Sequence, residues 1–279
     1  MKRKRILAMI LAVASCLSLA VSASAAGTTT RKATDFKDYD RTAWYAEAVS
    51  AAVDNRLLYG KSSTIIDPNG DMTRAEMAAI INRSFGCYKS ADVSQYKDVT
   101  KSKWYYKDVA MAVQMGTYNG RSASSMAPDA PISRQEAMTV VARALELDYD
   151  SYSKTDLSAF SDRSEISNWA LPYVRAMVGA DYIHGRGKIL APLENITRSE
   201  FAQIFFNIIG TYITAKGTYD KNIQGSALIR ADDVTLQNMT VDGDLIIGCG
   251  AADGKITLDN VTVKGRLLVW GGGTKAIYC

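Results

Sequence analysis

The stretch that decides the fold runs from Trp44 to Glu76 and reads WYAEAVSAAVDNRLLYGKSSTIIDPNGDMTRAE. Its landmarks are the tryptophan, a glycine 16 residues later, an apolar-x-Pro sequence, and an arginine six residues after that proline. The same landmarks return at the same spacings from Trp104 and from Trp169, and an aspartate precedes each tryptophan by six or seven residues. This recurrence indicates three copies of one unit of about sixty residues.

Each copy predicts a helix, a loop and a second helix. In the first copy, Ala46, Val49, Ala52 and Val53 follow the three-and-four spacing of a buried stripe. Thr42, Ser102 and Ser167, just before the tryptophans, are the expected N-caps of the first helices. Each second helix begins with a capping box, at Thr73-Arg74-Ala75-Glu76, Ser133-Arg134-Gln135-Glu136 and Thr197-Arg198-Ser199-Glu200. Two short helices bury little surface, so we expect the three copies to share one core.

The arginine of each capping box, Arg74, Arg134 or Arg198, lies in the first helical turn, where the helix dipole is positive. A cation there is mildly unfavourable, yet the chain places one there three times. One interpretation is an anionic ligand, because a guanidinium and a helix N-terminus both attract a carboxylate. The alternative is that each arginine pairs with an aspartate of the protein, such as Asp38 or Asp129.

Trp44, Trp104 and Trp169 also allow two interpretations. Each begins a helix among polar residues, where its ring could stack on the apolar face of a sugar. Each could equally fill the core, because tryptophan buries a large area. On the residues alone we favour the core, with one edge of the ring exposed.

The N-terminus predicts export. Four basic residues, an apolar run from Ile6 to Val21 and small residues up to Ala26 follow one another, which is the order of a secretory signal peptide over residues 1–26. A weaker interpretation takes Val13-Ala14-Ser15-Cys16 as a lipobox with Cys16 lipidated. Without residues 1–26 the chain has 29 basic and 29 acidic side chains, so no charge pattern for nucleic acid or an anionic membrane is present.

Cysteine and histidine usage argues against disulfide, metal and histidine-based catalytic frameworks. Cys87, Cys249 and Cys279 are odd in number and widely spaced, and His184 is the single histidine. We therefore expect no metal and no cofactor.

The aspartate, tryptophan, glycine, apolar-x-Pro and capping-box landmarks resemble the S-layer homology (SLH) domain, which occurs as three tandem copies in bacterial surface proteins. The resemblance implies an α + β multidomain chain with repeats at residues 35–90, 91–150 and 157–210 in a pseudo-threefold helical bundle. It implies anchoring to a secondary cell wall polymer on peptidoglycan, a carbohydrate bearing pyruvate ketals. By the same resemblance the three arginines clamp the carboxylate, the three tryptophans wall the grooves, and Gly60, Gly120 and Gly185 admit the sugar.

The sequence departs from the family where a glycine ends the first helix. The three positions hold Arg56, Gly116 and Asp181, so only the second copy conforms. A left-handed turn at Arg56 would cost about 1 kcal/mol. The tyrosine after the third tryptophan is also replaced, by Ala170. We therefore expect the three grooves to differ in binding.

Residues 211–279 differ in composition from the repeats: they contain short runs of β-branched residues separated by Gly and Asn. Residues 235–248 align with residues 257–270 at an offset of 22, which predicts rungs of a partial parallel β-helix with Asn238 stacked on Asn260. Two rungs bury little, so we expect an incomplete domain. The alternative function is an SLH-anchored polysaccharide lyase or hydrolase using Asp242, Asp244 or Asp259, although aspartates are ordinary turn residues. We expect a non-catalytic, secreted wall protein, and leave self-association into a surface lattice open.

Overall fold

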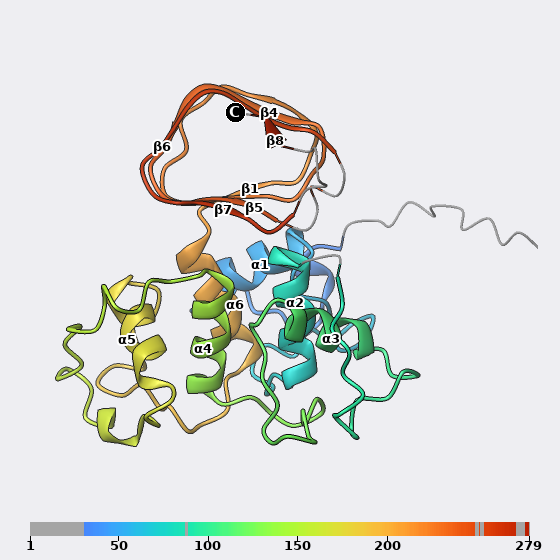
Figure 1. Ribbon diagram of the computed structural model, residues 1–279, viewed down its shortest axis with the longest axis vertical. Coiled ribbons are helices and arrows are strands. Elements are labelled where there is room, and N and C mark those ends of the chain that lie inside the picture. Colours follow the sequence, from blue (N-terminus) through green and yellow to red (C-terminus); the bar gives the residue numbers. More distant parts are fainter. Residues whose placement is uncertain (1–30, 87–88, 249–250, 252–253, 272–276, 279) are drawn as a thin grey trace, which may run out of the picture. The chain divides into compact units, whose positions relative to one another are not determined.

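A computed structural model describes residues 31–86, 89–248, 251, 254–271 and 277–278 (Figure 1). The predicted signal peptide, the alternative lipidation site at Cys16, and the other three cysteines lie outside the described residues. From Arg31 onward the chain belongs to one compact unit. Across the described part, no helix is both long and apolar enough to cross a membrane.

Each of the three copies forms the two predicted helices. The first copy has α1 (Ala46–Asp54) and α2 (Arg74–Phe85), the second α3 (Tyr106–Gln114) and α4 (Arg134–Ala144), and the third α5 (Leu171–Gly179) and α6 (Arg198–Ile208). Two 3₁₀ turns, η1 (Ala33–Asp35) and η2 (Arg163–Glu165), precede the first and third pairs. All three predicted capping boxes form. The N-caps predicted for the first helices were wrong, because those helices begin after Tyr45, Tyr105 and Ala170 without a side-chain cap.

The three copies pack in a cycle. Helix α3 packs on α2, α5 packs on α4, and α1 closes the cycle by packing on α6. At the centre, the amide of Met72 donates to the carbonyl of Ile196, that of Ile132 to Met72, and that of Ile196 to Ile132, each at 3.0 Å. All three side chains are fully buried. The predicted shared core is therefore present, and no copy completes it alone.

The recurring aspartates hold the loop before each second helix. The Asp38 carboxylate accepts from the backbone amides of Ile66 and Asp67 at 2.9 and 2.7 Å. Asp98 and Asp162 make the same pairs of hydrogen bonds in the other copies. The second amide of each pair belongs to a residue with positive φ, at Asp67 (55°), Ala127 (51°) and Ala191 (49°). The aspartate thus stabilises a strained turn that positions the following proline.

The first helices all end in a left-handed residue, as the family pattern requires. The φ angle is 56° at Arg56, 71° at Gly116 and 63° at Asp181. Only Gly116 adopts this conformation without a Cβ penalty. The first and third copies therefore carry a local strain of about 1 kcal/mol each.

In the described part of the chain after α6, eight parallel strands follow one another and alternate between two sheets. One sheet has the order β1 (Thr211–Ile213), β3 (Ala227–Ile229), β5 (Leu245–Ile247), β7 (Leu267–Val269), and the other β2 (Gly217–Tyr219), β4 (Val234–Val241), β6 (Ile256–Val263), β8 (Ile277–Tyr278). Strands β4 and β6 pair in the 22-residue register expected, with Thr235 opposite Thr257. Asn260 donates to Asn238 at 2.9 Å, and both residues have positive φ.

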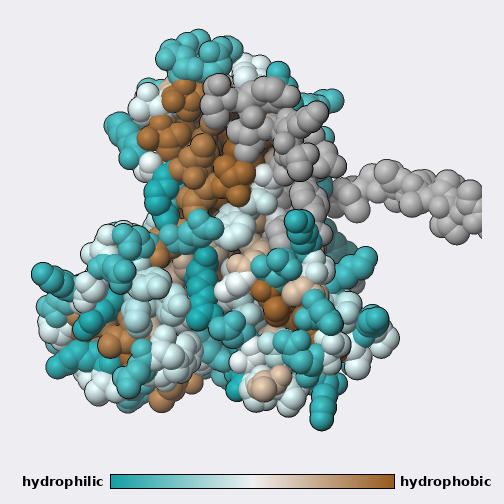
Figure 2. All heavy atoms as spheres, in the orientation of Figure 1, coloured by the Kyte–Doolittle hydropathy of each residue, from teal (hydrophilic) through white to brown (hydrophobic). Residues whose placement is uncertain are grey.

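The strands enclose an apolar interior, visible from one side as the brown area in Figure 2. They also share packing with the helices, because Leu228, Ile246 and Leu268 belong to the same buried cluster as the helical core. The Trp270 indole donates to the Ala144 carbonyl at 2.8 Å, and the Arg266 guanidinium donates to the Leu145 carbonyl at 2.8 Å. Both contacts satisfy carbonyls at the C-terminal end of α4, where a helix leaves them unpaired.

Candidate functional site: three grooves between the repeats

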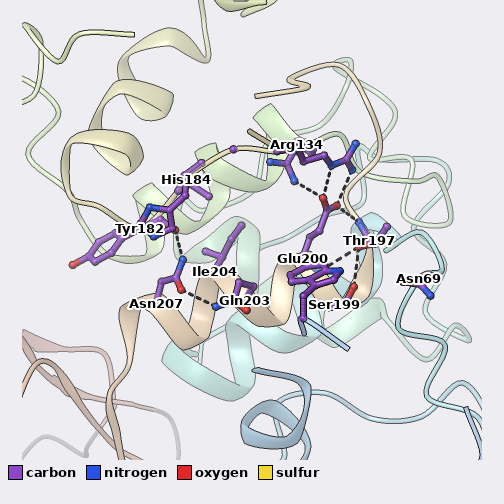
Figure 3. Close-up of a pocket in the computed structure, with 14 residues that line it drawn as sticks. Asn69, Arg134, Tyr182, His184, Thr197, Ser199, Glu200, Gln203, Ile204 and Asn207 are labelled. Atoms are coloured by element: carbon purple, nitrogen blue, oxygen red, sulfur yellow. Dashed lines mark hydrogen bonds and ion pairs between the residues drawn. The ribbon is translucent and has the colours of Figure 1, made fainter. Parts of the chain in front are cut away.

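Three grooves lie between the repeats, with cavity volumes of about 300, 420 and 470 Å³, which fall in the range of ligand pockets. We number each groove by the repeat that supplies its glycine loop and second helix. Groove 1 contains Tyr59, Gly60, Lys61, Glu76, Trp104 and Arg198. Groove 2 contains Asn119, Gly120, Arg121, Glu136, Trp169 and Arg74. Groove 3 contains His184, Gly185, Arg186, Glu200, Trp44 and Arg134 (Figure 3).

Every groove draws on all three repeats in cyclic order. Its loop and second helix come from one repeat, its arginine from the preceding repeat, and its tryptophan from the following repeat. The structure therefore brings together the arginine, tryptophan and glycine that the sequence singled out, but never those of a single repeat.

The tryptophans are exposed, so the interpretation that they fill the core was wrong. Trp44, Trp104 and Trp169 are 64%, 60% and 51% accessible to solvent. The residue that follows each of them is buried instead: Tyr45, Tyr105 and Ala170. The Trp-Tyr pair thus divides the two tasks, with the second residue in the core and the first on the groove. Ala170 keeps this arrangement without the tyrosine ring.

The capping-box arginines lie beneath the grooves, with side chains at most 6% exposed. The Nε of Arg74, Arg134 and Arg198 donates to the carbonyl of Met126, Leu190 and Ile66 respectively, at 2.7 to 2.9 Å. Their terminal nitrogens reach Glu136, Glu200 and Glu76, at 3.0, 3.0 and 3.2 Å. Each arginine therefore pairs with the capping-box glutamate of the neighbouring repeat. The alternative that they pair with aspartates was wrong: Asp38 accepts from loop amides and Asp129 from the Tyr105 hydroxyl, and the ion-pair partners of the arginines are glutamates.

A second cation shares each glutamate. Lys61 lies 2.6 Å from Glu76, Arg121 binds Glu136 through two nitrogens at 3.2 and 3.0 Å, and Arg186 binds Glu200 at 2.6 and 3.0 Å. Burial raises the pKa of these glutamates. The hydrogen bonds from the second cation and the N-cap amide lower the pKa, as does the positive charge of the buried arginine, and together they outweigh the effect of burial. The net pKa lies below its usual range, so each groove floor is a charged cation–glutamate–cation triad.

The glycines have an internal reason to be glycine. A Cβ on Gly60 would lie 2.5 Å from the Ser62 carbonyl, and one on Gly120 would lie 2.6 Å from the Ser122 carbonyl. Gly185 has a positive φ of 74° as well. The tight loop therefore requires glycine whether or not a sugar approaches, and the predicted role in admitting a sugar stays a prediction.

The sequence reasoning missed the cation that follows each glycine and a position at the far end of each groove. Lys61, Arg121 and Arg186 recur directly after the three glycines, so their periodicity could have identified them. Arg83, Arg143 and Asn207 occupy one equivalent position ten residues after each N-cap and line the three grooves. Among the residues that the structure describes, no cluster of three metal-ligating side chains occurs.

Comparison with known proteins matches the S-layer homology domain model at residues 35–78, 95–138 and 159–202. The surface-layer 125 kDa protein of Lysinibacillus sphaericus is 34% identical over 63% of this chain and 15% of its own length. An amylopullulanase of Thermoanaerobacterium thermosulfurigenes is 27% identical over 67% of this chain and 11% of its own. An endoglucanase of Bacillus sp. strain KSM-635 is 25% identical over 74% of this chain and 22% of its own. The chain thus spans under a quarter of these relatives.

Proposed function

The chain carries three tandem S-layer homology domains, and on that premise we propose that it is a non-catalytic anchoring protein whose grooves bind a pyruvylated secondary cell wall polymer. S-layer homology domains bind cell wall polymers, and proteins that carry them lie on the bacterial cell surface, so the chain is a secreted surface protein. The pyruvylated carbohydrate and the use of the grooves are our proposal.

One observation supports the proposal most strongly: three times an exposed tryptophan faces a groove floor that contains two cations and a glutamate, and each groove exists only when three repeats assemble. Exposed tryptophan is costly to leave in water and is suited to stacking on the apolar face of a sugar ring. Guanidinium and ammonium groups suit the carboxylate of a pyruvate ketal. A sugar that carries a carboxylate matches both features.

Within this proposal the buried arginines Arg74, Arg134 and Arg198 act mainly by positioning. Their guanidinium groups hold a carbonyl and a glutamate of the neighbouring repeat, so they fix the floor against which a ligand rests. Four of the five N–H groups of Arg74 have partners, and one on Nη1 has no hydrogen-bond partner among the described residues. Direct contact of that group with a carboxylate belongs to the same proposal and is tested below.

We further propose a pseudo-threefold bundle for the three repeats and a parallel β-helix for residues 211–279. The cyclic backbone hydrogen bonds among Met72, Ile132 and Ile196 support the first. The alternation of parallel strands between two sheets supports the second. The repeat boundaries 35–90, 91–150 and 157–210 follow from the same arrangement.

The relatives named for polysaccharide-degrading activity raise an alternative, an anchored enzyme. Two of the candidate carboxylates have partners that explain their presence structurally. Asp242 forms an ion pair with Lys264, and Asp244 forms an ion pair with Arg266 and also accepts a hydrogen bond from the Arg266 backbone amide. Only Asp259 has no such partner among the described residues, and a single carboxylate does not make a glycosidase pair. The described part is therefore better suited to anchoring.

The experiment is retention of the protein by purified cell wall sacculi before and after the secondary polymer is chemically removed. We expect retention on intact sacculi and its loss on stripped sacculi. Equal retention on both would move the binding to peptidoglycan and reject the polymer as ligand.

A further inference from the structure

The three grooves differ at one equivalent position of the second helix. Arg83 in groove 1 and Arg143 in groove 2 are replaced by Asn207 in groove 3. Each side chain is half-buried and lines its groove. The remaining floor is the same in kind: a buried arginine, a capping-box glutamate and a second cation. The molecule thus contains its own comparison of a groove with and without this cation.

The two arginines are held over aromatic rings and away from carboxylates. The Arg83 guanidinium lies 4.1 Å from the centroid of the Tyr59 ring and donates to the Leu57 carbonyl at 2.9 Å. The Arg143 guanidinium lies 4.8 Å from the centroid of the Tyr173 ring. Among the described residues, neither has a carboxylate within ion-pair distance. A guanidinium held over a ring by a cation–π interaction still has N–H groups that can bind a planar anion.

Charge balance separates the grooves further. In every groove the floor triad holds two cations and one glutamate, which leaves one positive charge. Arg83 or Arg143 adds a second in grooves 1 and 2. In groove 3, Arg186 also pairs with Glu194, which cancels the floor charge. Grooves 1 and 2 therefore carry more unbalanced positive charge than groove 3.

Groove 3 has a neutral hydrogen-bonding wall instead (Figure 3). Asn207 donates to the Tyr182 carbonyl at 3.1 Å and accepts from Gln203 at 2.8 Å. His184 stands on the same groove with an exposed ring. Amide and imidazole groups in the groove that Trp44 also lines suit the hydroxyl and acetamido groups of an uncharged sugar, not a carboxylate.

We propose that Arg83 and Arg143 set the anion selectivity of this protein: grooves 1 and 2 bind the carboxylate-bearing sugar, whereas groove 3 binds an uncharged sugar of the same polymer. This inference rests on the proposed wall-binding function. It assigns the carboxylate contact to residues outside the capping boxes, and it places the affinity of grooves 1 and 2 for the acidic sugar above that of groove 3.

The test is titration calorimetry of the protein with methyl 4,6-O-pyruvyl-N-acetylmannosaminide and with its methyl ester, which has the same shape without the charge. We expect two acidic-sugar sites per chain in the wild type. Arg83→Gln and Arg143→Gln each remove one site, with affinity about tenfold or more weaker, because each loses a charge-assisted pair. Asn207→Arg adds a third acidic-sugar site. The exposed Arg163→Gln, outside the grooves, serves as the matched control.

The methyl ester has no charge to pair with the two arginines. We expect it to bind grooves 1 and 2 about tenfold or more weakly than the acid does, and its affinity should not change in Arg83→Gln or Arg143→Gln. Circular dichroism and thermal unfolding establish that each variant is folded, and Asn207→Arg tests the inference by gain of a site even if an arginine variant unfolds.

Two results would overturn the inference: acidic-sugar stoichiometry that survives in the Arg83→Gln/Arg143→Gln variant, or no third site in Asn207→Arg. Sacculus retention, measured in parallel, distinguishes failure of the proposed wall-binding function from failure of the selectivity assignment. A wild type that fails to bind intact sacculi rejects the proposed function itself. If the wild type binds sacculi but either of the two results is found, only the assignment of selectivity is rejected. If it binds sacculi but has no acidic-sugar site, the pyruvylated carbohydrate is rejected as the ligand as well.

Discussion

Replacing Arg134 by methionine tests whether the capping-box arginine is structural. Its side chain is 6% exposed, its Nε donates to the Leu190 carbonyl at 2.7 Å, and its terminal nitrogen lies 3.0 Å from Glu200. Methionine fills much of the same volume but removes both contacts. Arg134→Met therefore disconnects the second repeat from the third without opening a large cavity.

The size of the expected stability loss depends on which partners Glu200 keeps in the variant. Breaking a buried ion pair costs about 3–5 kcal/mol when one charge is left uncompensated. Glu200 keeps Arg186 at 2.6 Å, so the lower end applies, and we expect the free energy of unfolding to fall by about 3 kcal/mol. A domain has about 5–15 kcal/mol in total, so the loss is large.

The assay is urea unfolding followed by circular dichroism, with sacculus retention measured under native conditions. Arg41→Met, an exposed arginine away from the grooves, should change stability by less than about 0.5 kcal/mol. A loss below about 1 kcal/mol in Arg134→Met, together with abolished retention, would refute the positioning role and show that the guanidinium contacts the ligand directly.

Three further predictions concern stability. Both Asp181 and Gly116 have positive φ, so Asp181→Gly should raise the free energy of unfolding by about 1 kcal/mol and Gly116→Ala should lower it by a similar amount. A Cβ on Gly116 would meet no atom within 4 Å, so the effect there is one of backbone conformation alone. Urea unfolding should show changes of opposite sign in the two variants. The pKa values of Glu76, Glu136 and Glu200 lie below the ordinary 4.5, so their stabilisation is present above that pH and is lost as the pH falls through the lowered values. The triple Glu→Gln variant should therefore lose less stability than the wild type as the pH falls below 4.5. Trp270→Phe removes the hydrogen bond to the Ala144 carbonyl and should cost about 1 kcal/mol by thermal unfolding, whereas an unchanged midpoint would place the strand segment away from α4.

Local signals in the sequence predicted much of this fold. The capping boxes fix the start of each second helix, because both partners lie within four residues of each other. The 22-residue offset fixed the register of β4 on β6 and the contact between Asn238 and Asn260. The landmark aspartates were found by their spacing, although their task of holding a positive-φ turn became visible only in three dimensions.

The long-range contacts of the site could not be predicted in the same way. Arg198 pairs with Glu76, 122 residues earlier in the chain, so only the cyclic packing brings them together. The exposure of Trp104 depends on the same closure, because the neighbouring Tyr105 occupies the core position that the helix offers. In the sequence, Arg83 is distinguished only by the arginine at the equivalent position of the second repeat, Arg143. It lines a groove because its helix faces that groove, which the sequence does not show.

If the three inter-repeat grooves hold the protein on the wall, the exposed tryptophans that line them are required for retention. The triple variant Trp44→Ala/Trp104→Ala/Trp169→Ala removes side chains that are at least half exposed, so the fold should survive. Leu193→Ala, an equally exposed apolar residue outside the grooves, is the control. In co-sedimentation with intact sacculi, we expect the folded triple variant to stay in the supernatant while wild type and Leu193→Ala sediment. Sedimentation of the triple variant at the wild-type level would contradict it.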